Sequence, residues 1–380
     1  MHLDHTTARG GAELALVRLL RAGGDWLPAV LVPAVDEADA FAALPPTVLR
    51  RTAGVAQGPG GSAGSPLRLA VLAARLVVQA VATRLNPLVR TCDVVAANST
   101  RAAAYAAVAL LGSRTPLVVH LRDMVDEESL GGFGHRVMTR LVLPRADGVI
   151  ANSHTTLSTA RPFLRDDAIT AVIPSAAGLT RAAARPPRTG PLRIGMLARI
   201  DPWKGQAELL EAFAVACRHG DAELEFAGGA PFEHEDFAAR LAARAAELGI
   251  ADRVRLLGHV DDVPEALARW DVGVQYSTRA EPLGQNVLQY LAAGLVTVVA
   301  DEGGPREWVT DGENGRRVAP RDPRALAEVL RELVEDAAAR ERLASAAPGT
   351  PGLLDDAAVA RAHAEIYREI ATRRRMPVKA

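Results

Sequence analysis

The 380-residue sequence has few of the features that mark the specialised classes of protein. It contains only two cysteines, Cys92 and Cys217, which lie far apart and lack the spacing of metal ligands. They provide neither a disulfide framework nor a zinc site, and they fit a reducing cytoplasm. The formal net charge of −1 gives no reason to expect nucleic acid or a strongly anionic surface as a partner.

Long hydrophobic runs are also missing. The longest, from Leu67 to Val81, is interrupted by Arg68 and Arg75, whereas a membrane-spanning helix needs about 20 mainly apolar residues. We interpret this run as a core helix, with a helix lying in a membrane interface as the alternative. The polar first residues give no sign of a signal peptide. The sequence therefore predicts a cytoplasmic protein without a transmembrane segment, for which peripheral contact with the inner membrane face stays open.

What the sequence does contain is a regular alternation of short apolar segments and amphipathic helical segments, which is typical of doubly wound parallel sheets. The length exceeds one ordinary hydrophobic core and predicts two α/β domains that face each other across a cleft. A Pro-, Arg- and Gly-rich stretch at 181–190 is the predicted linker, between a first domain at 1–180 and a second at 191–355. The predicted strands are Leu27–Val32, Asp93–Ala97, Pro116–His120, Gly148–Ala151, Ala171–Pro174, Ile194–Leu197, Leu224–Ala227, Val254–Leu257, Val272–Tyr276 and Thr297–Ala300.

The segment from Glu281 to Gly294 predicts a ligand site at a helix start. An acidic residue lies in a Pro/Gly turn just before an amphipathic helix, and the polar Gln289 follows about two helical turns later. Backbone N–H groups at a helix start attract anions, while Glu281 can accept hydrogen bonds from sugar hydroxyls and Gln289 can bond a ribose. The residues at the predicted helix start are Leu283, Gly284 and Gln285. A phosphate-binding helix end flanked by two hydroxyl-binding side chains indicates a nucleotide-sugar site.

A second loop carries two cations at a predicted strand-to-helix turn. Arg199 and Lys204 follow an apolar strand, and a helix is expected to begin at Gln206. Arg199 would bind a diphosphate as a bidentate fork and Lys204 as a point charge. Two ordinary surface cations in a solvated loop are the alternative. The combination with the Glu281 segment and with the turn Gly303–Glu307 favours the diphosphate.

Together these segments resemble the family 4 glycosyltransferases of the two-domain GT-B class. The matching pieces, in the family's order, are Gly10–Glu13, His120–Asp123, Asn152–Ser153, the Arg199/Lys204 loop, Glu281–Gly294 and Gly303–Glu307. The resemblance implies two Rossmann-like domains, with the acceptor bound mainly by the first and the nucleotide sugar mainly by the second. It also implies that the last helix, at 356–375, packs back onto the first domain.

The resemblance further implies a reaction. A sugar would move from a UDP- or GDP-sugar to an acceptor hydroxyl with retention at the anomeric carbon, without a metal or any other cofactor. The adjacent Asp261 and Asp262 are interpreted as a helix cap and not as metal ligands. A glycan, a glycolipid and a small secondary metabolite stay open as the acceptor. The alternatives are a nucleotide-sugar epimerase of the same fold, or a catalytically weak nucleotide-sugar-binding or scaffold protein.

By resemblance, individual residues receive roles. Gly10 and Gly11 would let the backbone approach the donor phosphates, and Val260 would lie near the nucleobase. Arg122 and Asp123 would face the acceptor. The residues expected to act on the reacting groups are His120, Arg199, Lys204 and Glu281.

The chain departs from the family pattern at Gln289, where the family usually has a second glutamate that binds the ribose. An amide can bond ribose hydroxyls, but without a charge-assisted hydrogen bond. A second departure concerns the start of the chain. Few residues precede the glycine pair Gly10–Gly11, and we expect the true start to lie upstream of Met1.

Overall fold

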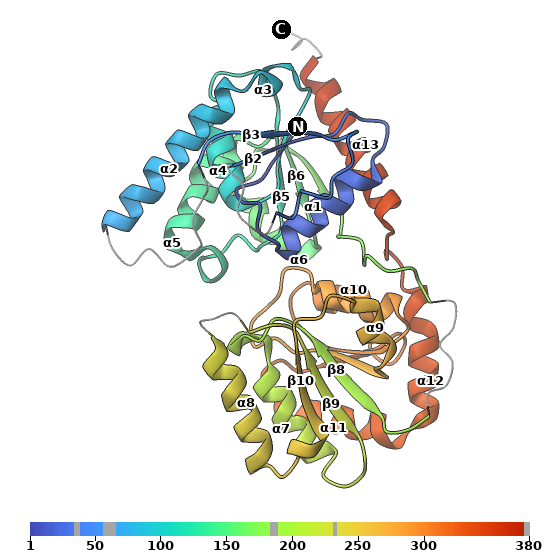
Figure 1. Cartoon of the computed structure of the whole chain (residues 1–380). Helices are drawn as coiled ribbons and strands as arrows, with labels where there is room; N and C mark the ends of the chain where they lie inside the picture. Colours follow the sequence, from blue (N-terminus) through green and yellow to red (C-terminus); the bar gives the residue numbers. More distant parts are fainter. Residues whose placement is uncertain (34–38, 56–65, 183–188, 231–233, 376–380) are drawn as a thin grey trace. The chain divides into compact units, whose positions relative to one another are not determined.

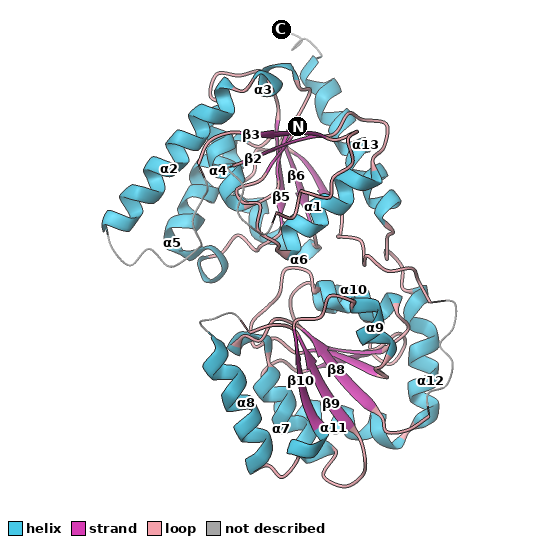
Figure 2. Ribbon diagram, viewed as in Figure 1, coloured by secondary structure: helices cyan, strands magenta, loops and turns pink. Residues whose placement is uncertain are grey.

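The protein folds into two α/β units, each built on one parallel sheet (Figures 1 and 2). The computed structural model describes residues 1–33, 39–55, 66–182, 189–230 and 234–375. The N-terminal unit comprises Met1–Ser175 together with the segment that begins at Asp356, and the C-terminal unit comprises Ala176–Asp355. Both sheets are wound in the doubly wound manner, which confirms the α/β class predicted from the sequence.

The sheet of the N-terminal unit has seven strands in the order β3-β2-β1-β4-β5-β6-β7. The residues of the five inner strands are almost all buried, as expected for a parallel sheet covered by helices on both faces, whereas the edge strand β3 is mostly exposed and the edge strand β7 is partly buried. The strand order reverses between β1 and β4, which creates a switch point where ligands commonly bind. The strands are β1 His2–Leu3, β2 Ala29–Val32, β3 Leu49–Thr52, β4 Val95–Ala97, β5 Leu117–Leu121, β6 Gly148–Ala151 and β7 Ile169–Val172.

Helices cover both faces of this sheet, and polar caps fix where several of them begin. Ser99 accepts a hydrogen bond from the Ala102 N–H at 3.2 Å, and Asp126 accepts one from the Ser129 N–H at 2.7 Å. Figure 1 shows the last helix, α13, beside α1, and these two helices are in contact. The helices are α1 Gly11–Ala22, α2 Pro66–Leu85, α3 Pro87–Thr91, α4 Thr100–Ala109, α5 Glu127–Val137, α6 His154–Ala160 and α13 Asp356–Arg375.

The C-terminal unit repeats this plan with six strands in the order β10-β9-β8-β11-β12-β13. Its switch point lies between β8 and β11. The strands are β8 Arg193–Leu197, β9 Glu223–Ala227, β10 Val254–Gly258, β11 Val272–Gln275, β12 Val296–Ala300 and β13 Arg316–Val318. The helices are α7 Gln206–Ala216, α8 Glu235–Glu247, α9 Val263–Ala268, α10 Gln285–Ala292, α11 Pro323–Glu335 and α12 Ala337–Ala346.

A buried tryptophan anchors one face of the C-terminal sheet. The Trp270 ring lies so close to Gly195 in β8 that a Cβ at position 195 would come 1.9 Å from it. Its indole N–H donates to the buried carboxylate of Glu225 at 2.8 Å, and Arg269 donates to the same carboxylate at 2.7 Å. The charge of Glu225 is therefore paired and hydrogen-bonded, as a buried carboxylate requires.

In the structure, the residues just before the predicted linker group with the C-terminal unit. The segment 176–182 belongs to the C-terminal unit, because its backbone is bonded there: Ala182 N–H donates to Ala292 O at 2.9 Å, and the Arg181 guanidinium donates to the carbonyl oxygen of Pro348 at 3.5 Å. Residues 183–188 of the predicted linker lie outside the described residues.

Three strands were absent from the sequence-based prediction, namely the two-residue β1 and the edge strands β3 and β13. Among the described residues, no helix has both the length and the hydropathy to cross a membrane.

Candidate functional site

The two central strands of the C-terminal unit, β8 and β11, end where the strand order reverses. Ligands of doubly wound sheets bind beyond the carboxyl ends of the strands at such a point. The loop after β8 carries Arg199 and Lys204 and leads into α7, and the loop after β11 carries Glu281 and leads into α10. The helix starts predicted at Gln206 and just after Gly284 are therefore confirmed.

Lys204 and Glu281 are 77 residues apart in the sequence, yet they meet in an ion pair. The Lys204 Nζ donates to the Glu281 Oε1 at 2.8 Å, and the side chains are only 19% and 9% exposed. The Gln275 amide donates to the same oxygen at 3.2 Å, and the Ser277 hydroxyl donates to it as well. Among the described hydrogen bonds none uses the Oε2 of Glu281, so this oxygen can accept a bond from a ligand hydroxyl.

The surroundings of Glu281 keep it ionised. Burial by itself raises the pKa of this carboxyl group, because a charge is poorly solvated there. The ammonium of Lys204 and the hydrogen bonds from Lys204, Ser277 and Gln275 outweigh burial, and the pKa of Glu281 falls below its ordinary value. At neutral pH the pair therefore presents one fixed anion and one fixed cation at the carboxyl end of the sheet.

The loops that carry this pair contain two further cations, Arg199 and Arg279. Arg199 is 58% exposed and donates its Nη2 to Asp201 at 2.9 Å. The ammonium of Lys204 and the guanidinium of Arg279 each lie 4.0 Å from the centre of the Trp203 ring, a distance at which a cation is attracted to an aromatic face. The sequence analysis did not single out Arg279. Its position in the loop after β11, two residues before Glu281, could have indicated a third cation near the site.

Close backbone packing holds the two loops in place. Gly205 has φ +84°, and a Cβ there would lie 1.8 Å from the carbonyl oxygen of Tyr276. Gly304 donates its N–H to the Glu281 carbonyl oxygen at 2.8 Å, and a Cβ at that position would collide with the Pro282 backbone. The predicted turn Gly303–Glu307 is thus the support on which the Glu281 loop rests.

We expect Gly205→Ala to lower the free energy of unfolding by well over about 1 kcal/mol, because alanine disfavours positive φ and its methyl group would strike the Tyr276 backbone. Gly249→Ala is the matched control, since Gly249 also has positive φ, +71°, but has no atom within 4 Å of its Cβ position. Urea denaturation of both variants measures the difference. Equal losses in the two variants would contradict the steric part of this explanation.

The other predicted donor-binding residues occupy different environments. Leu283 is buried in a hydrophobic cluster, so only its backbone can contact a ligand. The side-chain amide of Gln285 donates to the Ala176 carbonyl oxygen at 2.9 Å. Gln289 is partly exposed on α10, and Val260 packs at the edge of the Trp270 cluster. Their contacts with a nucleotide stay predictions.

His120 lies in an aromatic cluster inside the N-terminal unit. Its ring is 2% exposed, stacks on Tyr367 of α13 and bonds the Tyr367 hydroxyl through Nε2 at 2.7 Å. Burial, together with the positive charge of Arg122 and the neighbouring rings of His363 and His2, lowers the pKa of His120 well below its ordinary value. The imidazole is therefore neutral and packed, and its predicted contact with the donor stays a prediction.

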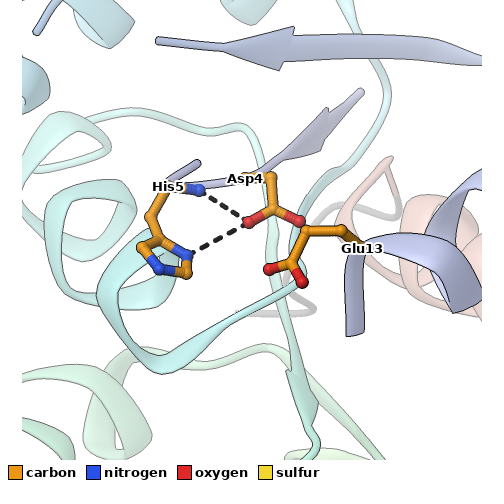
Figure 3. Close-up of side chains that lie close together, drawn as sticks. All are labelled: Asp4, His5 and Glu13. Atoms are coloured by element: carbon orange, nitrogen blue, oxygen red, sulfur yellow. Dashed lines mark hydrogen bonds and ion pairs between the residues drawn. The ribbon is translucent and has the colours of Figure 1, made fainter. Parts of the chain in front are cut away.

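A polar cluster that the sequence analysis missed lies at the carboxyl ends of β1 and β4. Asp4 is buried and accepts hydrogen bonds from the Asn98 amide and from the His5 backbone N–H, both at 2.7 Å. Figure 3 shows the carboxylate of Glu13, from the first turn of α1, beside Asp4 and His5. Arg122, predicted on the acceptor side, donates its Nε to Asn98 at 2.9 Å. The feature of the sequence that could have indicated this cluster is the pair Asp4-His5, which lies between a strand and a glycine-rich loop.

The predicted glycine loop borders this cluster. Gly10 caps α1 and Gly11 begins it. A Cβ on Gly10 would come 2.3 Å from the Oε2 of Glu13, so glycine leaves room for that carboxylate. Asp123 is exposed just after β5. The structure thus places Gly10, Gly11 and Arg122 at the switch point of the N-terminal sheet. It places Lys204, Arg199 and Glu281 at the switch point of the C-terminal sheet.

Residues 181–350 match the model of a family described as Glycosyl transferases group 1. The matched residues make up less than half of the chain, and they show that its C-terminal part is similar to this family. Among curated proteins, glycogen synthase from Mycobacterium tuberculosis is 34% identical over 168 residues, which cover 43% of this chain and 39% of the enzyme. Phosphatidyl-myo-inositol mannosyltransferase from Mycobacterium leprae is 29% identical over 209 residues, which cover 53% of this chain and 54% of that protein. These matches therefore span less than two thirds of either relative.

Solved structures resemble the chain over almost its whole length. HepE from Anabaena, crystallised with UDP, is 25% identical with a TM-score of 0.78, and the match covers 97% of this chain and 99% of HepE. Sucrose-phosphate synthase from Thermosynechococcus elongatus has a TM-score of 0.80 at 18% identity and supports the fold alone. The predicted GT-B fold is confirmed.

Proposed function

We propose that the protein is a glycosyltransferase that moves a sugar from a UDP- or GDP-sugar to an acceptor hydroxyl, without a metal. The observation that carries this proposal is the Lys204–Glu281 pair between the carboxyl ends of β8 and β11. It combines a cation suited to phosphate with a carboxylate suited to sugar hydroxyls. The complexes of HepE with UDP and with UDP-glucose favour UDP as the nucleotide.

In this reaction the bond between the anomeric carbon and the diphosphate breaks, and its electron pair leaves with the diphosphate. Lys204 and Arg199 would stabilise the growing negative charge on the leaving group. Fixed cations that match charge developing in the transition state commonly provide the largest part of catalysis. Because the chain's own side chains supply this charge, the proposed mechanism requires no divalent metal.

In the same proposal, Glu281 binds the hydroxyl groups of the donor sugar. Its Oε2 is free of the described hydrogen bonds, and its ionised form accepts strong bonds from hydroxyl groups. Retention at the anomeric carbon is proposed from the resemblance to family 4. We propose that the acceptor binds the N-terminal unit near Arg122, and its class stays open among glycans, glycolipids and small metabolites.

Thermal shift against UDP, GDP, ADP and dTDP tests this function, with Arg199→Ala as the probe variant. A ligand that binds only the folded state stabilises it by about 2.7 kcal/mol at a hundredfold excess over Kd. Arg255→Ala is the matched control, because Arg255 is 51% exposed and also pairs with a single carboxylate, that of Glu223. We expect one diphosphate to stabilise the wild type and the control but to stabilise Arg199→Ala much less.

No stabilisation by any of the four nucleotides would contradict the proposal and favour a scaffold protein. Nucleotide binding together with interconversion of the donor sugar in the absence of an acceptor would instead favour an epimerase.

A further inference from the structure

Helix α2 of the N-terminal unit exposes an apolar surface that the proposed function does not use. We infer that this surface docks the protein on a membrane that contains anionic lipids. The helix lies in the plane of the membrane, its apolar side chains enter the boundary between headgroups and acyl chains, and its arginines bind lipid phosphates. This docking does not depend on sugar transfer. The evidence is the anchoring of α2, the side chains that it exposes and the charge of the surrounding segment.

Contacts on one side of α2 fix its rotation. The helix packs against α4, which in turn contacts β4 and β5, so α2 lies one layer outside the sheet (Figure 1). The buried amide of Gln79 donates to the Ala53 carbonyl oxygen at 3.1 Å and accepts from the Val55 N–H at 2.9 Å. Ala80 and Thr83 are buried on the same side. The opposite side of α2 therefore faces away from the rest of the N-terminal unit.

The side that faces away is apolar. Residues three or four positions apart lie on one side of a helix, and at this spacing α2 carries one alanine and four large apolar residues. The four large side chains are between 48% and 63% exposed. Single exposed apolar residues are common on proteins, whereas a contiguous patch marks an interaction surface. We call this patch the valine stripe, and it consists of Val71, Ala74, Val78, Val81 and Leu85.

Arginines flank the valine stripe on both sides. At 3.6 residues per turn, Arg75 lies beside one edge of the stripe and Arg84 beside the other, and both are exposed. Arg84 is fixed there, because its Nη1 donates to the carbonyl oxygens of Ala109 and Leu111 at 2.8 Å. Basic residues beside an exposed apolar stripe are typical of helices that lie in a membrane interface.

The segment around α2 is strongly one-sided in charge. Between Asp39 and Asp123 the sequence contains nine arginines, no lysine and a single acidic residue, Asp93, although the whole chain has a formal net charge of −1. The helix α2 contains no acidic residue, and neither do α3 and α4, which contact it. The charge of this region therefore complements an anionic surface.

A second copy of the chain is the competing occupant of the valine stripe. Two copies that met along α2 about a twofold axis would bring the arginines of one copy close to those of the other. None of the helices α2, α3 and α4 has a carboxylate that could pair with these arginines, and like charges oppose association. Anionic lipid headgroups supply the missing negative charge, which favours the membrane.

Cosedimentation of the full chain with lipid vesicles tests this docking. One set of vesicles contains phosphatidylcholine alone, and the other contains an equimolar mixture of phosphatidylcholine and phosphatidylglycerol. We expect the protein to bind the mixed vesicles, to bind them more weakly in high salt because salt screens the arginines, and to bind phosphatidylcholine much less.

Variants of α2 locate the contact. Val78→Gln/Val81→Gln should weaken binding to the mixed vesicles about tenfold or more, because it removes apolar area from the stripe. Arg75→Gln should weaken it about fivefold. The matched control is Val215→Gln/Leu256→Gln, which changes two exposed apolar residues of the C-terminal unit and should bind like the wild type. Urea denaturation verifies that each variant remains folded.

Three outcomes would contradict the inference. Absence of binding to either kind of vesicle would remove the membrane as the partner. Equal binding of the wild type and both α2 variants would place the contact elsewhere on the chain. A wild type that ignores vesicles but forms a dimer, which Val78→Gln/Val81→Gln dissociates, would make the valine stripe an interface between copies. Nucleotide binding and sugar transfer are measured without vesicles, so a failure of the docking leaves the proposed function standing.

Discussion

Lys204→Met should lower kcat/KM for sugar transfer by about 1000-fold, the upper range for loss of one group that stabilises a transition-state charge. The reason is that Lys204 is a partly buried cation at the switch point and is held at 2.8 Å from Glu281. Methionine keeps the length of the side chain and its packing over Trp203 but removes the charge. The rate of nucleoside diphosphate release at limiting donor concentration measures the effect.

The same substitution leaves Glu281 buried without its cation, which costs about 3 kcal/mol or more of folding stability. The double variant Lys204→Met/Glu281→Gln separates the two effects, because it also removes the unpaired charge. We expect the double variant to recover most of the lost stability, measured by urea denaturation, and to remain inactive. A double variant that regained transfer activity would show that Lys204 serves only to neutralise Glu281.

Acid should destabilise the N-terminal unit through its buried histidines. Burial lowers the pKa of His363 from 6.5 to about 4, since charged imidazole is poorly solvated beside Tyr367 and Arg122. His2 and His120, which share the Tyr367 hydroxyl, also have their pKa values lowered well below the ordinary value, mainly by burial. Below pH 6.5 these histidines become protonated in the unfolded chain, whereas they stay neutral in the folded chain. The free energy of unfolding therefore falls as the pH falls below 6.5.

His363 alone should remove about 3 kcal/mol of stability as the pH falls from 6.5 to 4. Chemical denaturation at several pH values, compared between the wild type and His363→Leu, isolates this contribution from that of the carboxylates. His259→Leu is the control, because the His259 side chain is 77% exposed. An equal pH dependence in the wild type and in His363→Leu would contradict the assignment.

Local patterns were sufficient to predict the helix starts and the loops of the donor site. A Pro/Gly turn before an apolar helix located Glu281, and a strand followed by Arg and Lys located Lys204. The pairing of these two residues could not be predicted, because it depends on β8 and β11 being neighbours in the sheet although other strands separate them in the sequence. Sequence order does not specify which strands become neighbours at a switch point.

His120 shows that a position at the end of a strand does not determine which residues the side chain contacts. Val119 and Leu121 face the core cluster on one side of the sheet, so the alternation of β5 places His120 on the opposite face. There α13, more than 200 residues later in the chain, supplies Tyr367 as its partner at a separation of 247 residues. His5 escaped notice for a different reason, because β1 has only two residues and gives almost no periodic signal.

Phosphorus NMR of the nucleoside diphosphate selected by thermal shift tests the central claim most directly, because it reports on the phosphates themselves. If Lys204 and Arg199 hold the diphosphate, titration with the wild-type protein should shift and broaden the β-phosphate resonance, and Lys204→Met should abolish most of this change. An equal β-phosphate shift with wild type and Lys204→Met would contradict a donor site built on the Lys204–Glu281 pair.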